Sequence, residues 1–426
     1  MKRILRPFFI GVALFCLAAS FTWAHGQAES SSAKGPKTIT LLTWNLPHYA
    51  STIHEWISTF EKANPNVTVK WIDKKGTELP TYYETQLAAG TAPDVVDLQG
   101  AVFYHFAAEG ALKNLTPYFA KHPTIKSRFQ PSILKAASLY KGKYYTVPFY
   151  TPSTVLYYNR NIFNAAGIGH APTTFNELVS DSQKLTHGNV SGFLTLNFGW
   201  LYWPLFRANG VTILNSGHTK SAFDTPAGVK TLATLSQLTQ KGDIARISWT
   251  GRWVGPNASF GAGDAAMFNA HITALRAFES SSKWTNPQTV GIAPFPGKWS
   301  VPNYHGFGIT ASSKHPNTAW DFATYITNEK WARTTATVLG TLTGNYKADT
   351  SLINSSTFSQ SHPLVAKNFK VDLSEAGHLT GFTGSAQDPK IKSTVYSDLE
   401  KALFGEESPS KALSAAKQSV NSILGQ

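Results

Sequence analysis

The fold is decided by residues 87–98, LAAGTAPDVVDL, where a helix ends, the chain turns and a strand begins. Residues 82–89 are typical of a helix, and Gly90 ends it. Residues 94–98 form a short, mostly apolar run of the kind found in strands that are buried on both faces. This order predicts a helix that returns the chain to a buried sheet.

Two further strands and a helix precede this segment. Lys37–Trp44 (KTITLLTW) alternates in polarity and is rich in Thr, Ile and Leu, which is typical of a strand, and residues 67–72 repeat the pattern. Between them, residues 54–64 carry apolar side chains at helical spacing, and the helix stops before Pro65. Alternating strands and helices predict a parallel sheet with helices on both faces.

The pattern restarts after Pro148 with a strand expected at residues 154–158. Amphipathic helices are expected at 175–184, 229–239, 319–327 and 411–424. The sequence contains no internal repeat. It therefore predicts two α/β units, the second of which begins near Pro148.

The N-terminus resembles an export signal. Three basic residues at positions 2, 3 and 6 precede an apolar run at 8–19, which is too short to span a bilayer. Small-residue cleavage sites follow, so we expect a signal peptide at 1–28, a polar linker at 29–37 and secretion across the cytoplasmic membrane. An uncleaved anchor is one alternative. A lipid anchor on Cys16 is another, although the bulky Phe15 stands where a small residue is usual.

Composition and charge exclude several classes of protein. The 426 residues are 42% hydrophobic, as in a globular chain, and the single cysteine excludes a disulfide framework and a Cys-based zinc site. The net charge is +13, and the basic residues are scattered, which favours a solvated surface over a nucleic-acid site. Because only 25 residues are acidic, we also consider an acidic external environment.

The sequence lacks the common catalytic motifs. It contains no G-x-S-x-G elbow, P-loop, H-E-x-x-H or CxxC, and Gly261-Ala262-Gly263 is only a fragment of a dinucleotide fingerprint. Paired carboxylates for glycoside hydrolysis stay open as a possibility, with Asp94, Asp97, Asp224 and Asp264 as candidates. We expect no enzyme, no cofactor and no metal site.

The twelve tryptophans include candidates for a pocket. Trp200 and Trp203 lie beside Gly and Pro in a predicted loop, Trp249 and Trp253 flank another, and Trp44 ends the first strand. Aromatic rings stack on the apolar faces of sugars. Core packing is the alternative for each single tryptophan.

Several segments form an ordered pattern that is more specific than any one of them. These segments are FEKANP (60–65) with VTV (67–69), LAAGTAPDVV (87–96), GALKNLT (110–116), YTVPF (145–149), LYYNRNIF (156–163), AGI (166–168), PTTFNEL (172–178), FGAGDAAM (260–267) and residues 290–296, 308–314 and 412–424. In this order the chain resembles the extracellular solute-binding proteins of ATP-driven carbohydrate importers, the maltose-binding-protein-like family. The resemblance covers essentially the whole mature chain.

The resemblance implies a periplasmic-binding-protein-like fold of two α/β lobes, each a mainly parallel sheet flanked by helices, joined by a hinge of several segments. We place the N-terminal lobe at 38–148 plus 307–350 and the C-terminal lobe at 149–306 plus 351–426. Ligands of open α/β sheets lie beyond the carboxyl ends of the strands. The resemblance also implies a monomer that binds a sugar and the permease of an ABC importer.

Candidate ligand contacts follow from the resemblance, position by position. They are Trp44 and Asn45 after the first strand, Gln99 after the third strand, Tyr150 and Ser153 on a hinge segment, Trp200 and Trp203 in the aromatic loop, Asn269 and His271 after FGAGDAAM, and Tyr304 and His305 in a Gly-rich hinge segment.

Two departures from the family pattern bear on the ligand. Relatives that bind glycerol-3-phosphate carry an arginine in the segment that corresponds to residues 381–384, which is GFTG here. Phosphate favours a bidentate guanidinium, so its absence disfavours a phosphorylated ligand. The proline usual around residues 340–344 is also missing, which makes contacts there doubtful. A neutral oligosaccharide of two or three rings fits the aromatic, mostly uncharged candidates.

The expected mechanism is capture without catalysis, in which a sugar that bridges both lobes favours the closed form. The second hypothesis is a secreted carbohydrate-active enzyme or lectin-like module. A nucleic-acid binder is the third, and its affinity would fall steeply with salt.

Overall fold

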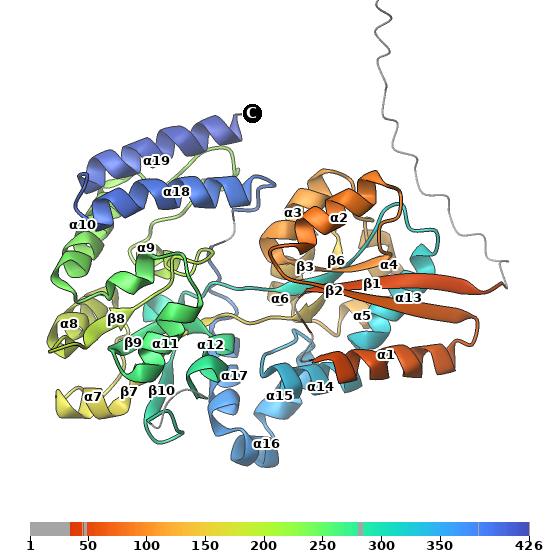
Figure 1. Cartoon of the computed structure of the whole chain (residues 1–426), viewed down its shortest axis with the longest axis horizontal. Coiled ribbons are helices and arrows are strands. Elements are labelled where there is room, and N and C mark those ends of the chain that lie inside the picture. Colours follow the sequence, from red (N-terminus) through yellow and green to blue (C-terminus); the bar gives the residue numbers. More distant parts are fainter. Residues whose placement is uncertain (1–34, 45, 47–48, 280–283, 382, 426) are drawn as a thin grey trace, which may run out of the picture.

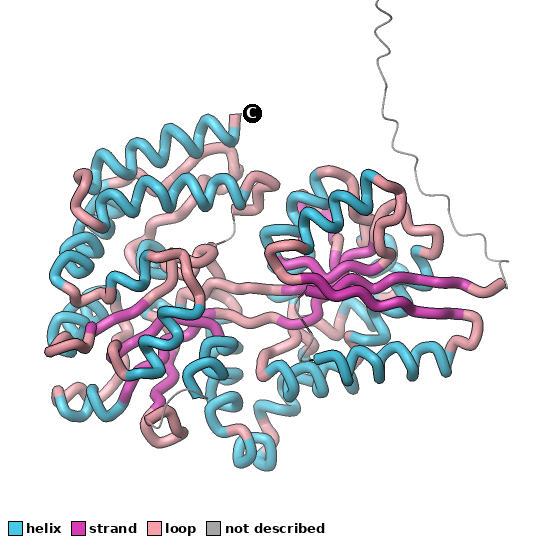
Figure 2. The backbone as a smooth tube through the Cα atoms, viewed as in Figure 1, coloured by secondary structure: helices cyan, strands magenta, loops and turns pink. Residues whose placement is uncertain are grey.

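The computed structural model describes residues 35–44, 46, 49–279, 284–381 and 383–425. The expected signal peptide, most of the expected linker and the candidate Asn45 lie outside the described residues. Two lobes stand side by side and are joined by extended segments (Figures 1 and 2). The strands are β1 (Lys37–Trp44), β2 (Val67–Lys74), β3 (Val95–Gln99), β4 (Leu139–Tyr140), β5 (Lys143–Tyr144), β6 (Thr146–Tyr150), β7 (Thr154–Asn159), β8 (Ser191–Leu194), β9 (Ala265–His271), β10 (Val290–Ala293) and β11 (His305–Ile309).

Helices surround both sheets, and those expected from the sequence are present with ends shifted by a few residues. They are α1 (Ala50–Ala63), α2 (Leu79–Ala88), α3 (Gly100–Ala108), α4 (Thr116–Lys121), α5 (Pro123–Lys126), α6 (Pro131–Ser138), α7 (Arg160–Ala165), α8 (Phe175–Leu185), α9 (Trp203–Arg207), α10 (Pro226–Lys241), α11 (Val254–Ala262), α12 (Ile272–Glu279), α13 (Pro316–Ile326), α14 (Glu329–Leu339), α15 (Tyr346–Ile353), α16 (Ser356–Ser361), α17 (Pro363–Glu375), α18 (Asp388–Leu403) and α19 (Pro409–Leu424).

The first lobe is built on a five-stranded sheet of order β2-β1-β3-β11-β6. Successive side chains of a strand point to opposite faces of the sheet, so β1 contributes to two cores. Ile39 and Leu41 pack in one core with α1 and α13, whereas Leu42 packs in the other with α2 and α3. β1 runs parallel to β2 and β3, but β11 is antiparallel to both of its neighbours. The sheet is therefore mixed.

The second lobe is built on a four-stranded sheet of order β10-β7-β9-β8. Only β8 and β9 pair in parallel, because β7 runs against both of its neighbours. α8, α10, α18 and α19 cover one face, and α11, α12 and α17 cover the other. Two α/β lobes flanked by helices are confirmed, and each sheet is mixed: its strands share one direction except for a single reversed strand, β11 in the first lobe and β7 in the second. In each lobe a strand that arrives from the other lobe is inserted in the reverse direction.

The chain crosses between the lobes in three segments that lie close together. β6 passes into β7 through residues 151–153, and the chain returns from β10 to β11 through residues 294–304. A third passage, residues 340–345, leads from α14 toward helices that pack on the second sheet. These passages contact one another, since Thr151 N donates to Leu342 O at 2.6 Å and Asn303 N donates to Pro152 O at 2.8 Å. Tyr150 at the end of β6 and His305 at the start of β11 belong to the first-lobe sheet, although the expected boundaries assigned 149–306 to the second lobe. The exact lobe boundaries stay a prediction.

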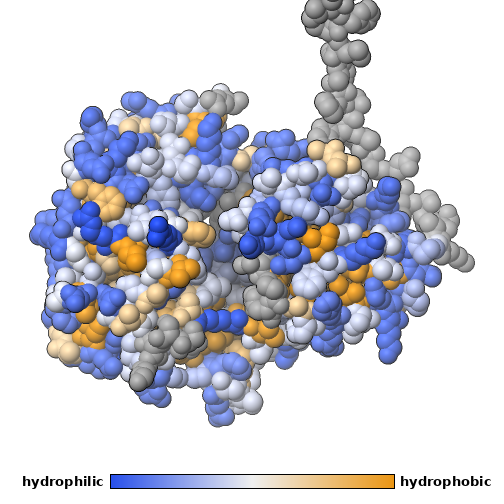
Figure 3. Space-filling model, viewed as in Figure 1, coloured by the Kyte–Doolittle hydropathy of each residue, from blue (hydrophilic) through white to orange (hydrophobic). Residues whose placement is uncertain are grey.

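The surface view shows a hydrophilic face with small apolar patches on both lobes and a notch between them (Figure 3). Among the described helices, none is both long and apolar enough to cross a membrane. A search of the same residues finds no group of three or more His, Cys, Asp and Glu side chains that could hold a metal ion.

Candidate functional site

A cavity of about 380 Å³, here called the cleft cavity, lies between the lobes where strand ends converge. In the first lobe, Trp44, Gln99 and Tyr150 are the last residues of β1, β3 and β6, and His305 is the first of the antiparallel β11. In the second lobe, His271 is the last residue of β9. All of these positions lie at strand ends that face the other lobe, and open α/β sheets bind ligands beyond the carboxyl ends of their strands.

The first-lobe wall is aromatic and fixed by a buried hydrogen bond. His305 stacks on Tyr150 with ring centroids 4.2 Å apart and meets Trp44 edge-on at 5.1 Å. Its Nδ1 lies 2.9 Å from Oδ1 of Asp97, and both side chains are buried. Gly76 packs against the Trp44 indole, where a Cβ would collide with the ring. Asp97 and Gly76 therefore support the His305 and Trp44 rings on the side away from the cavity.

The second-lobe wall carries three rings. Trp253 lies 6.0 Å from His271 and 5.9 Å from Phe198. Phe198 is 45% exposed, which is unusual for so large an apolar side chain in this protein. The lobes thus present aromatic surfaces from both sides of one cavity.

Polar side chains complete the cleft cavity. The Gln99 amide donates to Asn303 Oδ1, and Thr273 and Thr341 add hydroxyl groups. The guanidinium of Arg276 on α12 donates to the carbonyl of Val338 on α14, which joins the second lobe to the first.

Burial keeps two ring systems of the wall uncharged at neutral pH. Desolvation lowers the pKa of His271 to about 4, and nearby His305 adds to this shift. Desolvation, together with the negative charge of Asp97, raises the pKa of Tyr150 well above its usual value. The lining is therefore aromatic and polar, with Arg276 as its permanent charge.

The structure brings together five of the residues expected from the sequence. Trp44, Gln99, Tyr150, His271 and His305 line the cleft cavity. Trp200 lines an adjoining recess, but it is buried and its Nε1 donates to Asp388 at 3.1 Å.

Four other expected contacts face the protein interior and do not line the cleft cavity. Trp203 stacks on Phe206 in the second-lobe core, 4.7 Å between centroids. Asn269 Nδ2 donates to Leu201 O, and Ser153 Oγ donates to Asp372. Tyr304 packs against α6. Each lies on the strand or loop expected, but its side chain is held inside the protein and does not line the cleft cavity.

Other lining residues were not among the expected ligand contacts. Trp253 was considered for a pocket on its sequence position, whereas Phe198 was not singled out, and its exposure is seen only in the structure. Thr273, Arg276 and Asn303 come from α12 and a crossing segment. Polar residues on a helix or a loop carry no pattern that distinguishes a cavity wall from an ordinary surface.

The four aspartates considered for catalysis hold structural bonds. Asp94 accepts from Thr40 N and Ser313 Oγ, Asp97 contacts His305, and Asp224 pairs with Lys417. Asp264 forms backbone bonds with Ser259 and Ser191. None of these four lines the cleft cavity.

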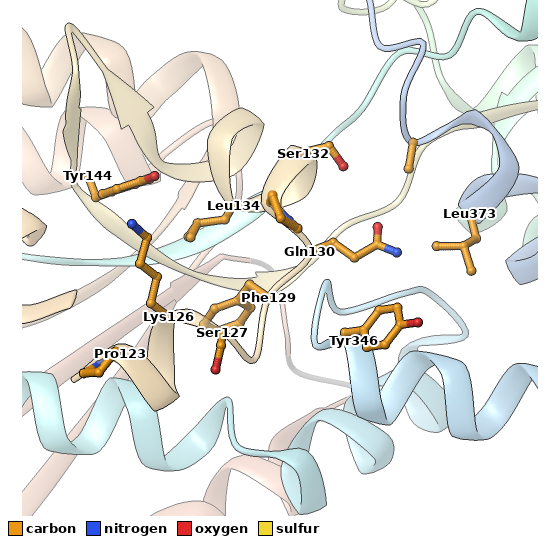
Figure 4. A pocket seen from close by; sticks show the side chains of 12 residues that line it. Pro123, Lys126, Ser127, Phe129, Gln130, Ser132, Leu134, Tyr144, Tyr346 and Leu373 are labelled. Carbon is orange, nitrogen blue, oxygen red and sulfur yellow. The ribbon is translucent and has the colours of Figure 1, made fainter. Parts of the chain in front are cut away.

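A larger cavity of about 850 Å³, here called the hinge cavity, also has walls from both lobes. Lys126, Phe129 and Gln130 face Tyr346 on α15 and Leu373 on α17, and Figure 4 shows Gln130 pointing toward Leu373 across the gap. The passage that follows α14 has one end in each cavity, since Thr341 lines the cleft cavity and Tyr346 lines the hinge cavity.

Comparison with known proteins assigns the family. A family model described as "Bacterial extracellular solute-binding protein" matches residues 44–333, more than half of the chain. The chain belongs to this family. Its members are non-enzymatic solute-binding components of ABC importers that work outside the cytoplasm, so the expectation of a binding protein is confirmed and that of an enzyme is set aside.

Curated relatives are distant. The galactooligosaccharide-binding protein of Bacillus subtilis (strain 168) is 25% identical over 76% of this chain and 77% of its own length. The sn-glycerol-3-phosphate-binding periplasmic protein UgpB of Shigella flexneri is 27% identical, and the match spans 64% of each chain.

Solved structures share the fold along nearly the whole chain. The substrate-binding protein Lmo0181 from Listeria monocytogenes, in complex with cycloalternan, aligns with a TM-score of 0.76 at 23% identity, covering 92% of this chain and 99% of the other. Maltose-bound T. maritima MalE3 aligns with a TM-score of 0.74 at 20% identity, covering 91% and 100%.

Proposed function

We propose that this protein captures a neutral oligosaccharide of two or three rings in the cleft cavity and delivers it to the permease of an ABC importer. The observation that carries the proposal is the pair of opposed aromatic walls, with Trp44, Tyr150 and His305 on one lobe and Trp253 and Phe198 on the other. Aromatic faces offer flat, rigid contact area at low entropic cost. Two such walls provide stacking surface for more than one sugar ring.

The size and polarity of the cavity support a sugar. A volume of about 380 Å³ falls in the range of small-molecule sites. Amides and hydroxyls of Gln99, Asn303, Thr273 and Thr341 offer both donors and acceptors to ligand hydroxyls. Relatives whose names include galactooligosaccharide, cycloalternan and maltose support the same class.

A phosphorylated ligand is the second candidate, because the UgpB relatives bind sn-glycerol-3-phosphate. Phosphate is usually held by several cationic donors. In the cleft cavity the permanent cation is Arg276, which is already bonded to Val338 O, and residues 381–384 contain no arginine. The lining therefore favours the neutral sugar.

The proposed mechanism is closure around the ligand. Residues 151–153, 294–304 and 340–345 connect the lobes, and small backbone rotations there would change the width of the cleft. A sugar that contacts both walls stabilises the closed form. The closed protein then docks on the permease, which supplies the ATP-driven step.

A thermal-shift screen of the mature protein tests the proposal. The panel is maltose, cellobiose, trehalose, sucrose, maltodextrins and glycerol-3-phosphate. A ligand present at 100 times its Kd adds about 2.7 kcal/mol of stability. We expect a clear shift with one or more neutral sugars. A shift with glycerol-3-phosphate alone, or no shift with any neutral sugar, contradicts the proposal.

A further inference from the structure

A recess of about 60 Å³ adjoins the cleft cavity and shares Gln99, Phe198, His271 and Asn303 with it. Its remaining wall includes Trp200, Asp388 and Lys392. A water molecule in the liquid occupies about 30 Å³, so the recess has room for roughly two waters. It is too small for a sugar ring but large enough for a short polar arm of a ring that lies in the cleft cavity.

His271 is the buried polar side chain that distinguishes this recess. It is 3% exposed, and the backbone of Val301 raises its pKa against the larger lowering caused by burial. Nε2 has no hydrogen-bond partner among the described residues. A neutral imidazole has one N–H donor and one acceptor nitrogen, so the Nδ1–H tautomer presents Nε2 as an acceptor.

The surroundings keep His271 in this state. Burial lowers its pKa to about 4, and the neighbouring His305 adds to this shift. Arg276 and Lys392 in the two cavity walls are cations, and Asp388 in the recess wall is a buried carboxyl group whose pKa is raised by burial. A buried acceptor without a hydrogen-bond partner costs the protein free energy, and a ligand donor that reaches it removes this cost.

We infer that the recess is a hydroxymethyl subsite, in which Nε2 of His271 accepts a hydrogen bond from an exocyclic primary hydroxyl of the bound sugar. The inference rests on the proposed function and narrows the ligand to a hexose-containing oligosaccharide. A carboxylate does not suit the recess, because it offers only acceptors to an acceptor. An ammonium group would meet the cation of Lys392 there, and the carboxyl group of Asp388 in the same wall already accepts hydrogen bonds from Trp200 Nε1 and Thr383 Oγ1.

Paired sugars test the subsite in the wild-type protein. Cellobiose and xylobiose have the same linkage, but xylobiose lacks the hydroxymethyl arms; maltose differs from its 6-deoxy and 6′-deoxy forms only by one hydroxyl. Isothermal titration calorimetry at pH 7 gives the Kd of each. For whichever set binds, we expect the parent sugar to bind at least tenfold more tightly than xylobiose, or than one of the two deoxy forms.

Two variants assign the preference to His271. His271→Phe keeps a flat ring without an acceptor, and it should reduce the preference to about twofold or less. His271→Gln restores an acceptor and should recover part of the preference. In the wild type, affinity for the hydroxyl-bearing sugar should fall as the pH drops toward 4, whereas the Gln variant should lack this component.

The outcomes separate the two proposals. In the wild type, equal affinity for cellobiose and xylobiose, or for maltose and both its 6-deoxy and 6′-deoxy forms, overturns the hydroxymethyl subsite and leaves oligosaccharide capture standing. A preference that survives intact in a folded His271→Phe variant also overturns the role of His271. Binding of none of these five sugars, nor of any neutral sugar in the panel, overturns capture and the subsite together.

Discussion

The cleft cavity and the hinge cavity both lie between the lobes, yet the smaller one has the features of a ligand site. The hinge cavity has about 850 Å³ against about 380 Å³, but its walls come mainly from helices and their connecting loops. The cleft cavity collects the ends of β1, β3, β6, β9 and β11. Volume alone is thus a poor guide to a binding site.

The difference between the two cavities lies in how their side chains are held. In the cleft cavity, His305 is fixed by Asp97, Tyr150 and Trp44. In the hinge cavity, Tyr346 is 54% exposed and lies at the first turn of a short helix. Rigid, supported aromatic groups bind a ligand with less loss of entropy than exposed ones.

The largest expected effect concerns Asp349, which anchors the passage between the cavities. Its carboxylate accepts from Thr343 N, Thr343 Oγ1 and Gly344 N, but burial raises its pKa to about 7. The folded pKa exceeds the unfolded one because burial favours the neutral carboxyl group, so the stability that Asp349 contributes is full below about pH 4 and is lost as the pH rises through about 7. A shift of about three units corresponds to on the order of 4 kcal/mol.

Other buried groups set the net sign of the pH dependence. Burial raises the pKa of Asp372, Glu375 and Asp388 as well, which adds to the trend. His271 opposes it, because its folded pKa of about 4 lies below the unfolded value and its contribution is lost as pH falls from about 6.5 to 4. We expect higher stability at pH 5 than at pH 8, consistent with an acidic environment.

Urea unfolding at a series of pH values measures this dependence. The Asp349→Asn variant removes the titrating group and should flatten the curve between pH 5 and 8. A wild-type protein that loses stability steadily from pH 8 to pH 5 contradicts the expectation.

The second effect compares one aromatic residue in each cavity. Trp253→Ala removes a ring from the second-lobe wall and should weaken sugar binding by about 2 kcal/mol, roughly thirtyfold. Tyr346→Ala removes the exposed ring of the hinge cavity and should change the Kd by less than about twofold. Calorimetric titration with the sugar found in the screen gives both values. If Tyr346→Ala proves the more damaging change, the assignment of the ligand to the cleft cavity is wrong.

The periodicity of apolar residues and the positions of Gly and Pro predicted most of the fold. The alternating Lys37–Trp44 strand, the stop at Gly90 and the restart after Pro148 correspond to β1, the end of α2 and the passage to β7. Strand direction could not be predicted in the same way. β11 joins its sheet across about 150 residues of intervening chain, and only tertiary packing decides that it runs antiparallel.

The candidate site was predictable where a residue ends a strand. Trp44, Gln99, Tyr150 and His271, which the resemblance implied, are each the last residue of a strand, and ligands of open α/β sheets lie beyond strand ends. Depth along a strand and packing decide the rest. Asn269 shares a strand face with His271 but lies two residues farther from the strand end, where it donates to Leu201 O inside the lobe. Trp203 begins α9 and packs in the core. A single sequence does not show which of these side chains the rest of the chain covers.

The third effect concerns the bond that joins the lobes over the cleft cavity. Arg276 donates to Val338 O at the C-terminal end of α14, where the helix dipole favours a cation, and Gly340 leaves room for the guanidinium. Arg276→Ala should favour the open form and weaken sugar binding by about 1 kcal/mol, roughly fivefold.

A matched control separates this bond from a general loss of charge. Arg333 lies on the same α14 and forms an exposed pair with Glu329 at 3.0 Å. Arg333→Ala should leave the Kd within about twofold. Small-angle X-ray scattering of the free protein should show a larger radius of gyration for the Arg276 variant only. Unchanged scattering and affinity would show that the bond does not bias closure.

The smallest expected effect is the response of sugar affinity to salt. The chain carries a formal charge of +13, which invites a nucleic-acid interpretation, but the cleft cavity is lined mainly by aromatic and uncharged polar groups. A neutral ligand displaces no condensed counterions, so the Kd should change by less than about twofold between 50 and 500 mM NaCl. A nucleic acid bound through several lysines and arginines would instead lose affinity steeply over this range. A titration at both salt concentrations, with the sugar from the screen and with single-stranded DNA, therefore decides between them: steep, salt-sensitive DNA binding without any sugar binding would move the functional surface from the cleft to the basic exterior.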